Sequence, residues 1–159
     1  MNPYASHLGG QDARQVIGQT PERLRRLIER LGPEGCKRPR APGKWTAREI
    51  ACHLADTEIA FAFRLRQALA EPHHTIQPFD QDAWSRPYSN LRIEDAVETF
   101  AALRRWNLAL LDGVSEQDYT KPVTHPERGT MTFRTIVETM GGHDRNHLQQ
   151  LEALAAEES

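Results

Sequence analysis

The sequence predicts an all-α fold, a four-helix bundle formed by one domain over residues 1–159. The chain contains ten glycines and ten prolines, yet none falls within residues 44–71 or 88–112. From residue 130 onward only Gly141 and Gly142 interrupt the sequence. Glycine and proline are the residues that a helix interior tolerates least, so these three stretches are predicted helices.

The first helix is expected over residues 20–31. Thr20 can cap it, Pro21 suits the first helical position, and Glu22 complements the positive end of the helix. A short helical turn over residues 12–17 is expected before it. The second helix, over residues 46–70, opens with the capping box Thr46-Ala47-Arg48-Glu49.

The third and fourth helices are expected over residues 92–112, closed by Gly113, and over residues 132–155. No segment shows the sustained alternation of a strand, so we expect no β-sheet of three or more strands. The links over residues 32–45, 71–91 and 113–129 exceed the roughly 2–8 residues usual in an up-down bundle. At least one crossover, or a structured loop over one end of the bundle, is therefore predicted.

Composition and charge exclude several classes of protein. Hydrophobic residues make up 38% of the chain and charged residues 26%, which is enough for one modest core. No apolar run approaches the roughly 18 residues of a membrane-spanning helix. The net charge of -2 argues against a nucleic-acid partner. Two cysteines, Cys36 and Cys52, and the absence of a recognisable secretory signal favour a reduced, cytoplasmic protein.

Three of the seven histidines are predicted to face the core from two helices. Winding each helix at roughly 100° per residue places His53 at the edge of the apolar stripe of the second helix, and His143 and His147 in the middle of the stripe of the fourth. A lone inward histidine is more often a hydrogen-bonded core residue. Three of them among apolar side chains favour a shared cation, since His-x3-His puts two imidazoles on one helix face about 6 Å apart.

Other residues around this site leave alternatives open. Gly141 and Gly142 precede His143 and either allow a helix or ligand to approach closely or mark a kink. Arg104, in the centre of the third stripe, either snorkels to the bundle end or holds an anionic substrate group. Cys52 points away from His53 and is excluded as a ligand; with Ile59 and Phe63 it forms an outward stripe for another helix or a second subunit.

The sequence resembles the DinB/YfiT-like family, the DinB superfamily. The signature that opens the second helix of that family is similar to Gly43-Lys44-Trp45-Thr46-Ala47-Arg48-Glu49-Ile50, followed by His53-Leu54-Ala55-Asp56 and Glu58. Its second half is similar to Gly142-His143-Asp144 followed by His147-Leu148-Gln149-Gln150-Leu151. Weaker matches are Phe100 with Arg104 and the loop from Phe79-Asp80 to Trp84.

This resemblance implies a dimeric four-helix bundle of crossed connectivity that binds one divalent metal, nickel or zinc. The implied ligands are His53, His143 and His147. Some relatives are thiol S-transferases that use bacillithiol or mycothiol, and many others are described as metal-dependent hydrolases. Arg104, Asp80 and Trp84 are the residues that we expect to contact substrate.

Two classes of function remain open at this level. A metalloenzyme acting on a small molecule would use the open coordination position of a three-histidine site. A metal-stabilised bundle that serves as a non-catalytic binding module would close that position with a fourth protein ligand. No carboxylate is clearly placed as a general base, since Asp144 points away from His143 and Glu58 lies at the margin of its stripe. Metal affinity is expected to fall as the pH drops below the ordinary histidine pKa of about 6.5.

Overall fold

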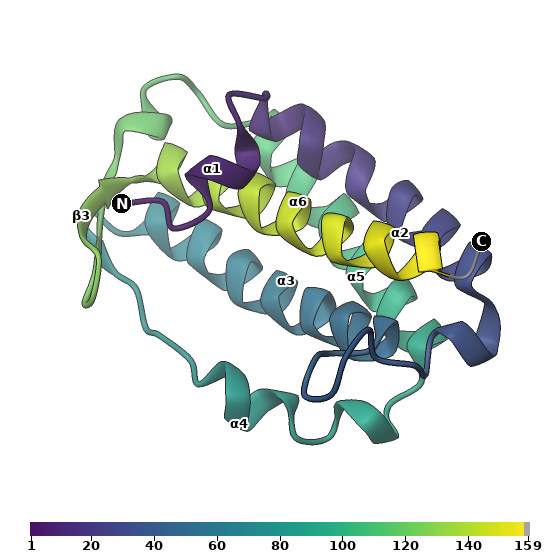
Figure 1. Cartoon of the computed structure of the whole chain (residues 1–159). Helices are drawn as coiled ribbons and strands as arrows, with labels where there is room; N and C mark the ends of the chain where they lie inside the picture. Colours follow the sequence, from purple (N-terminus) through teal and green to yellow (C-terminus); the bar gives the residue numbers. More distant parts are fainter. Residues whose placement is uncertain (158–159) are drawn as a thin grey trace.

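Four long helices dominate the computed structural model, which describes residues 1–157 (Figure 1). They are α2 (Ala13–Gly35), α3 (Ala47–Ala70), α5 (Ile93–Asp112) and α6 (Phe133–Glu157). Two short helices, α1 (Ala5–Leu8) and α4 (Gln81–Ser85), and two 3₁₀ turns, Tyr88–Asn90 and Asp118–Thr120, lie in the connections. Within this range no helix is both long and apolar enough to cross a membrane.

The helix starts agree with the sequence except at α2. Thr46 and Glu49 form the predicted capping box of α3. The prediction that Thr20 caps the first helix is wrong: Asp12 caps α2 by accepting a hydrogen bond from the amide of Gln15 at 2.7 Å. The expected short turn is therefore the first part of α2, which continues through Pro21. Gly32 interrupts the helix with a φ of 66°, at the predicted end.

The connectivity is crossed, as predicted. Around the bundle, α2 packs against α6, α6 against α3, α3 against α5, and α5 against α2. The consecutive helices α2 and α3 are therefore diagonal partners with little mutual contact. The same bundle architecture places α5 and α6, which are also consecutive, on the other diagonal. Long links are needed to connect helix ends across a bundle diagonal.

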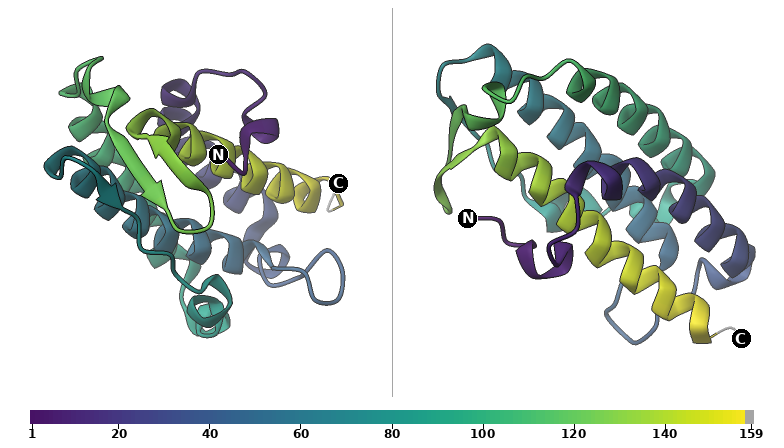
Figure 2. Two further views of the ribbon diagram at one scale, coloured as in Figure 1. Left: turned by 90° about the vertical axis from the view of Figure 1, so that its left-hand side faces the viewer. Right: turned by 90° about the horizontal axis from the view of Figure 1, so that it is seen from above.

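A small sheet at one end of the bundle contradicts the expectation that no three-stranded sheet forms. Strand β2 (Pro122–His125) pairs antiparallel with β3 (Gly129–Thr132) and parallel with β1 (His74–Thr75). Figure 2 shows the hairpin lying across the helices. Strands of two to four residues are too short to show alternation, and the inward position His125 is polar. The sheet is minor, and the all-α bundle stands.

A buried polar layer crosses the bundle between two apolar clusters. Each long helix contributes residues to both clusters; in α3, for example, Leu54 belongs to one and Phe61 to the other. The residues between them are polar although they are buried. The layer comprises Thr20 of α2, His53, Thr57 and Glu58 of α3, Arg104 and Asn107 of α5, and His143, Asp144 and His147 of α6.

The glycine pair in α6 lets the N-terminal segment lie directly on that helix. A Cβ atom on Gly142 would lie 2.4 Å from the carbonyl oxygen of Tyr4, and one on Gly141 would lie 3.1 Å from the Leu8 side chain. Helix α6 is unbroken through both glycines. Of the two interpretations of the pair, close approach of another helix is confirmed and a break is not.

We expect Gly142→Ala to lower the free energy of unfolding by about 1–3 kcal/mol, because the added methyl group meets backbone atoms that cannot move cheaply. Gly18→Ala is the matched control, since nothing lies within 4 Å of the added Cβ in α2. That substitution is expected to stabilise the helix by about 0.5–1 kcal/mol. Urea unfolding of both variants checks the pair, and equal stabilisation by both would contradict the contact with Tyr4.

Candidate metal centre

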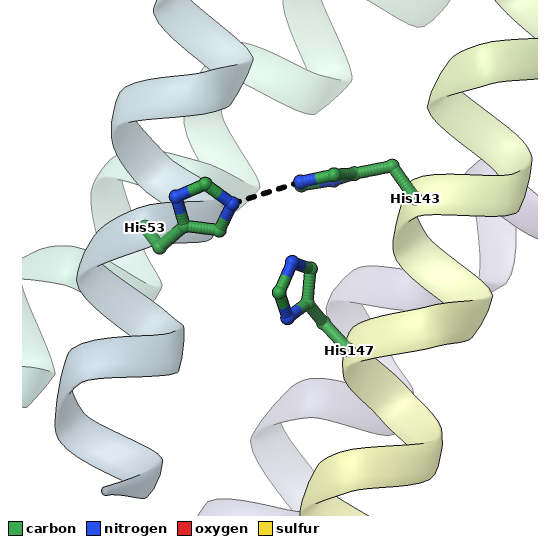
Figure 3. A group of neighbouring side chains, drawn as sticks. All are labelled: His53, His143 and His147. Atoms are coloured by element: carbon green, nitrogen blue, oxygen red, sulfur yellow. Dashed lines mark hydrogen bonds between the residues drawn. The ribbon is translucent and has the colours of Figure 1, made fainter. Parts of the chain in front are cut away.

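The three predicted histidines converge in the polar layer (Figure 3). His53 extends from α3, and His143 and His147 extend from successive turns of α6. Nε2 of His53 lies 2.9 Å from Nε2 of His143, and one nitrogen from each of the three rings lies within 4.8 Å of the others. Among the described residues, these three form the group of histidine, cysteine and acidic side chains with spacing suited to one metal ion.

Burial makes these imidazoles neutral, the protonation state that a metal ligand needs. The three side chains are 1–5% exposed. Desolvation, and then the nearby His147, lowers the pKa of His53 to about 3. Desolvation also lowers the pKa of His147 to about 4, and it places that of His143 well below its ordinary value. Protons therefore compete with a metal ion for these nitrogens only at a pH below the value near 6.5 that the sequence suggested.

Gln150 orients one of the three rings. Its Oε1 accepts a hydrogen bond from Nδ1 of His147 at 3.0 Å, and an amide oxygen can only accept. The proton of His147 is therefore on Nδ1, which leaves the lone pair of Nε2 free for a cation. The donor set, three neutral imidazoles with no carboxylate or thiolate, suits zinc or nickel better than magnesium or calcium. Gln150 was not assigned a role from sequence, although its position three residues after His147 is a detectable signal.

Buried neutral histidines make stability depend on pH. In the unfolded chain each has a pKa of about 6.5, so the unfolded state binds more protons below that pH. The stability of the metal-free protein is thus fully present above pH 6.5 and is lost as the pH falls towards the folded-state values of about 4 for His147 and about 3 for His53. We expect a loss approaching about 1.4 kcal/mol per pH unit for each histidine.

Urea unfolding in the presence of a chelator, at about pH 7 and about pH 5, measures this loss. His147→Ala removes one of the three groups and should reduce the difference between the two pH values. His73→Ala, which removes an exposed histidine, should leave the difference unchanged. A wild-type protein equally stable at both pH values would contradict burial of neutral rings.

Aromatic residues and two cavities surround the histidines. The Trp45 ring lies 4.8 Å from that of His53 and stacks at 6.3 Å on that of His147, while the Tyr4 ring meets His143 edge-on at 5.3 Å. A cavity of about 790 Å³ reaches His147, and a second, of about 240 Å³, reaches His53 and His143. Tyr4 and Gln81 line both. The site is therefore accessible from two directions.

Arg104 has neither of the roles expected from sequence. It is 1% exposed, so the interpretation that it snorkels to the bundle end is wrong. Its Nε and one terminal nitrogen donate to Glu58 at 2.9 and 2.7 Å, and both terminal nitrogens donate to Asp144 at 2.5 and 3.1 Å. A fifth hydrogen bond, 2.8 Å long, reaches the carbonyl oxygen of Ile17. All five N–H groups are occupied by protein, which leaves no donor for a substrate.

This network depends on the proline inside α2. Pro21 has no N–H, so the carbonyl of Ile17, four residues earlier, lacks its helical donor. Arg104 supplies that donor from α5. Burial alone would lower the pKa of Arg104, but the carboxylates of Asp144 and Glu58 outweigh it and raise the pKa. Glu58 and Asp144 are therefore committed to an ion-pair network, and neither is free to act as a general base.

Asp80 and Trp84 do not line either cavity. Asp80 caps α4 by accepting a hydrogen bond from the amide of Ala83 at 3.0 Å, and Trp84 packs on Phe79 with ring centroids 4.6 Å apart. Their neighbours Phe79 and Gln81 line the smaller cavity instead. The loop chosen from sequence therefore borders the smaller cavity through Phe79 and Gln81, and not through Asp80 or Trp84.

Comparison with known proteins identifies a family. A family model described as the DinB superfamily matches residues 17–151. A protein of Oceanobacillus iheyensis named "Putative metal-dependent hydrolase" is 29% identical over 139 residues, which are 87% of this chain and 81% of that protein. A Bacillus cereus protein with the same name is 26% identical over 88% of this chain and 82% of its own length.

A solved structure shares the fold. YfiT from Bacillus subtilis, described as a probable metal-dependent hydrolase with an unusual four-helix bundle topology, superimposes with a TM-score of 0.85. The alignment covers 92% of this chain and 85% of that one, at 23% sequence identity. At that identity the likeness establishes the four-helix-bundle architecture.

Proposed function

Because the chain belongs to the DinB superfamily, we propose that it is a metal-dependent hydrolase whose divalent ion is held by His53, His143 and His147. The observation that carries the proposal is the convergence of three buried, neutral imidazoles within 4.8 Å of one another at the meeting point of two cavities. Zinc and nickel are the proposed ions. When bound, such an ion lowers the pKa of a coordinated water and polarises a carbonyl or phosphoryl oxygen.

The access to the histidines favours an enzyme over the alternative, a metal-stabilised binding module. A structural zinc site is closed by a fourth protein ligand. Here the candidate group among residues 1–157 contains three ligands, and both cavities reach it. Gln150 and the helix positions hold the rings, while Trp45 packs on His53 and Tyr4 packs on His143. The chain's own residues therefore orient the ligands and leave space for a small-molecule substrate.

Metal titration of the purified protein tests the proposal. We expect one equivalent of zinc or nickel to bind per chain by calorimetry, and elemental analysis to find the ion after dialysis. A panel of small esters and amides, assayed with and without the ion, then tests for hydrolysis that a chelator abolishes. No binding of either metal would contradict the proposal. Binding without any hydrolysis would favour the non-catalytic alternative.

Transfer of a group to a low-molecular-weight thiol is a second candidate, favoured by the presence of two cavities on the histidines. Hydrolysis needs one organic substrate and water, whereas transfer needs room for two organic molecules. The same panel assayed with bacillithiol or mycothiol separates the two, because only a transferase would require the thiol.

Homodimer assembly and a cytoplasmic location stay predictions. The outward stripe proposed for assembly is smaller than expected from sequence. Cys52 is buried, 3% exposed, whereas Ile59 and Phe63 are 47% and 56% exposed. Cys52 therefore belongs to the core, and the two exposed residues alone support a dimer contact.

A further inference from the structure

The smaller cavity beside the histidines is lined by cationic side chains that form no ion pair with the acidic residues among 1–157. Arg64 of α3 and Arg128, from the turn between β2 and β3, both line it. Several other arginines do have a carboxylate within reach, such as Arg23 with Glu152 and Arg134 with Glu116. Among the described residues, no ion pair involves Arg64 or Arg128.

The contacts of Arg64 position its guanidinium without neutralising it. The group lies 5.9 Å from the ring centre of Phe61 and 5.6 Å from that of Phe79. One terminal nitrogen donates to the carbonyl oxygen of Gln77 at 3.3 Å. These partners hold the guanidinium between two rings and a backbone carbonyl, and the single hydrogen bond to Gln77 leaves further N–H groups that can donate to an anion.

Arg128 is close enough to act on the same space. After burial, the charge of Arg128 is the second cause that lowers the pKa of Arg64. Burial raises the pKa of Tyr4, and the charge of Arg128 opposes that rise. Burial lowers the pKa of His125, and the charge of Arg128 lowers it further. Tyr4 and His125 both line the cavity. Two guanidinium groups thus face one small space, and their repulsion would be relieved by a bound anion.

The remaining charged groups do not cancel this field. Glu127 is the acidic side chain in the lining, and it is exposed at the hairpin turn. Cationic groups therefore outnumber the single carboxylate, and a divalent ion on the histidines would increase the excess.

We propose that this cavity binds the anionic group of a small organic substrate, a carboxylate or a similar oxyanion, through Arg64 and Arg128. The proposal rests on the proposed function, because it places the reacting part of that substrate next to His53 and His143. The cavity volume of about 240 Å³ is the volume that about eight water molecules occupy in the liquid, so the substrate is small. Phe61, Pro78 and Phe79 in the lining favour an apolar portion beside the charge. The anion-binding role considered for Arg104 is thus assigned to Arg64 and Arg128 instead.

Benzoate and its neutral isostere benzamide test this proposal by calorimetric titration into zinc-loaded and zinc-free protein. We expect wild-type protein to bind benzoate at least about tenfold more tightly than benzamide, in both forms. Arg128→Gln and Arg64→Gln should each weaken benzoate binding about tenfold and leave benzamide unchanged. Arg64→Lys keeps the charge and should retain most of the preference.

Arg105→Gln is the matched control, because Arg105 is exposed on α5 and lines neither cavity beside the histidines. It removes the same net charge and should not alter benzoate binding. Arg128 lies in an exposed turn, so its replacement tests the proposal even if Arg64→Gln fails to fold. Equal benzoate affinity in wild type and Arg128→Gln, or binding that requires zinc and ignores both arginines, would overturn the proposal. Zinc uptake is measured separately, so failure of the metal centre is distinguished from failure of the anion subsite.

Discussion

Replacing His147 by alanine is expected to weaken zinc binding by at least about a hundredfold. Loss of a group that merely orients a ligand costs about 10–100-fold in affinity, so loss of one of three direct ligands should cost more. The ring of His147 is 5% exposed, and its Nε2 is free because Nδ1 is bonded to Gln150. Two imidazoles from His53 and His143 would remain, which is too few for a stable zinc site. Calorimetric titration with zinc at about pH 7 measures the change.

His73→Ala is the matched control for this experiment. His73 is exposed, and its Nε2 lies 2.8 Å from the hydroxyl of Thr124, outside the histidine cluster. Its removal should leave zinc affinity unchanged. The His147 variant should still fold, because both apolar clusters of the bundle are intact. Circular dichroism confirms the helix content, and equal zinc affinity in a folded His147→Ala variant and in wild type would refute the site.

Arg104→Met is expected to lower the free energy of unfolding by about 3–5 kcal/mol. The substitution leaves the carboxylates of Glu58 and Asp144 buried, each 1% exposed, without their shared counter-ion. It also leaves the carbonyl of Ile17 without a donor, since Pro21 cannot supply one. Replacing a whole buried ion cluster by apolar residues is often neutral, whereas removing one partner is strongly destabilising. Urea unfolding of the metal-free variant at about pH 7 measures the loss.

Two further variants separate the network from helix propensity. Arg105→Met changes the adjacent, exposed residue of the same helix and is expected to alter stability by less than about 0.5 kcal/mol. Arg104→Lys keeps the charge but offers three donors in place of five, so its stability should lie between those of wild type and Arg104→Met. An Arg104→Met variant as stable as Arg105→Met would show that the five hydrogen bonds contribute nothing net.

Features that depend on local periodicity could be predicted from the sequence. Helix rotation of about 100° per residue sets the direction of each side chain relative to its neighbours, and breakers and caps set the helix ends. The second, third and fourth predicted helices and the inward direction of the three histidines follow from these rules. The same local rules predicted the wrong start for α2. Thr20 and Pro21 resemble a helix start, but Asp12 had already capped the helix about two turns before them.

What only the tertiary structure decided is which distant groups each side chain meets. The sequence placed Arg104 on an inward stripe, but its partners Glu58 and Asp144 lie 46 and 40 residues away, on two other helices. The cavity wall that carries Arg128 comes from a hairpin whose four-residue strands have no periodic signal of their own. Local rules determine the direction of a side chain from the helix axis. The identity of its partner depends on the crossed packing of the helices and on where the long links return, because those contacts join segments that the sequence separates.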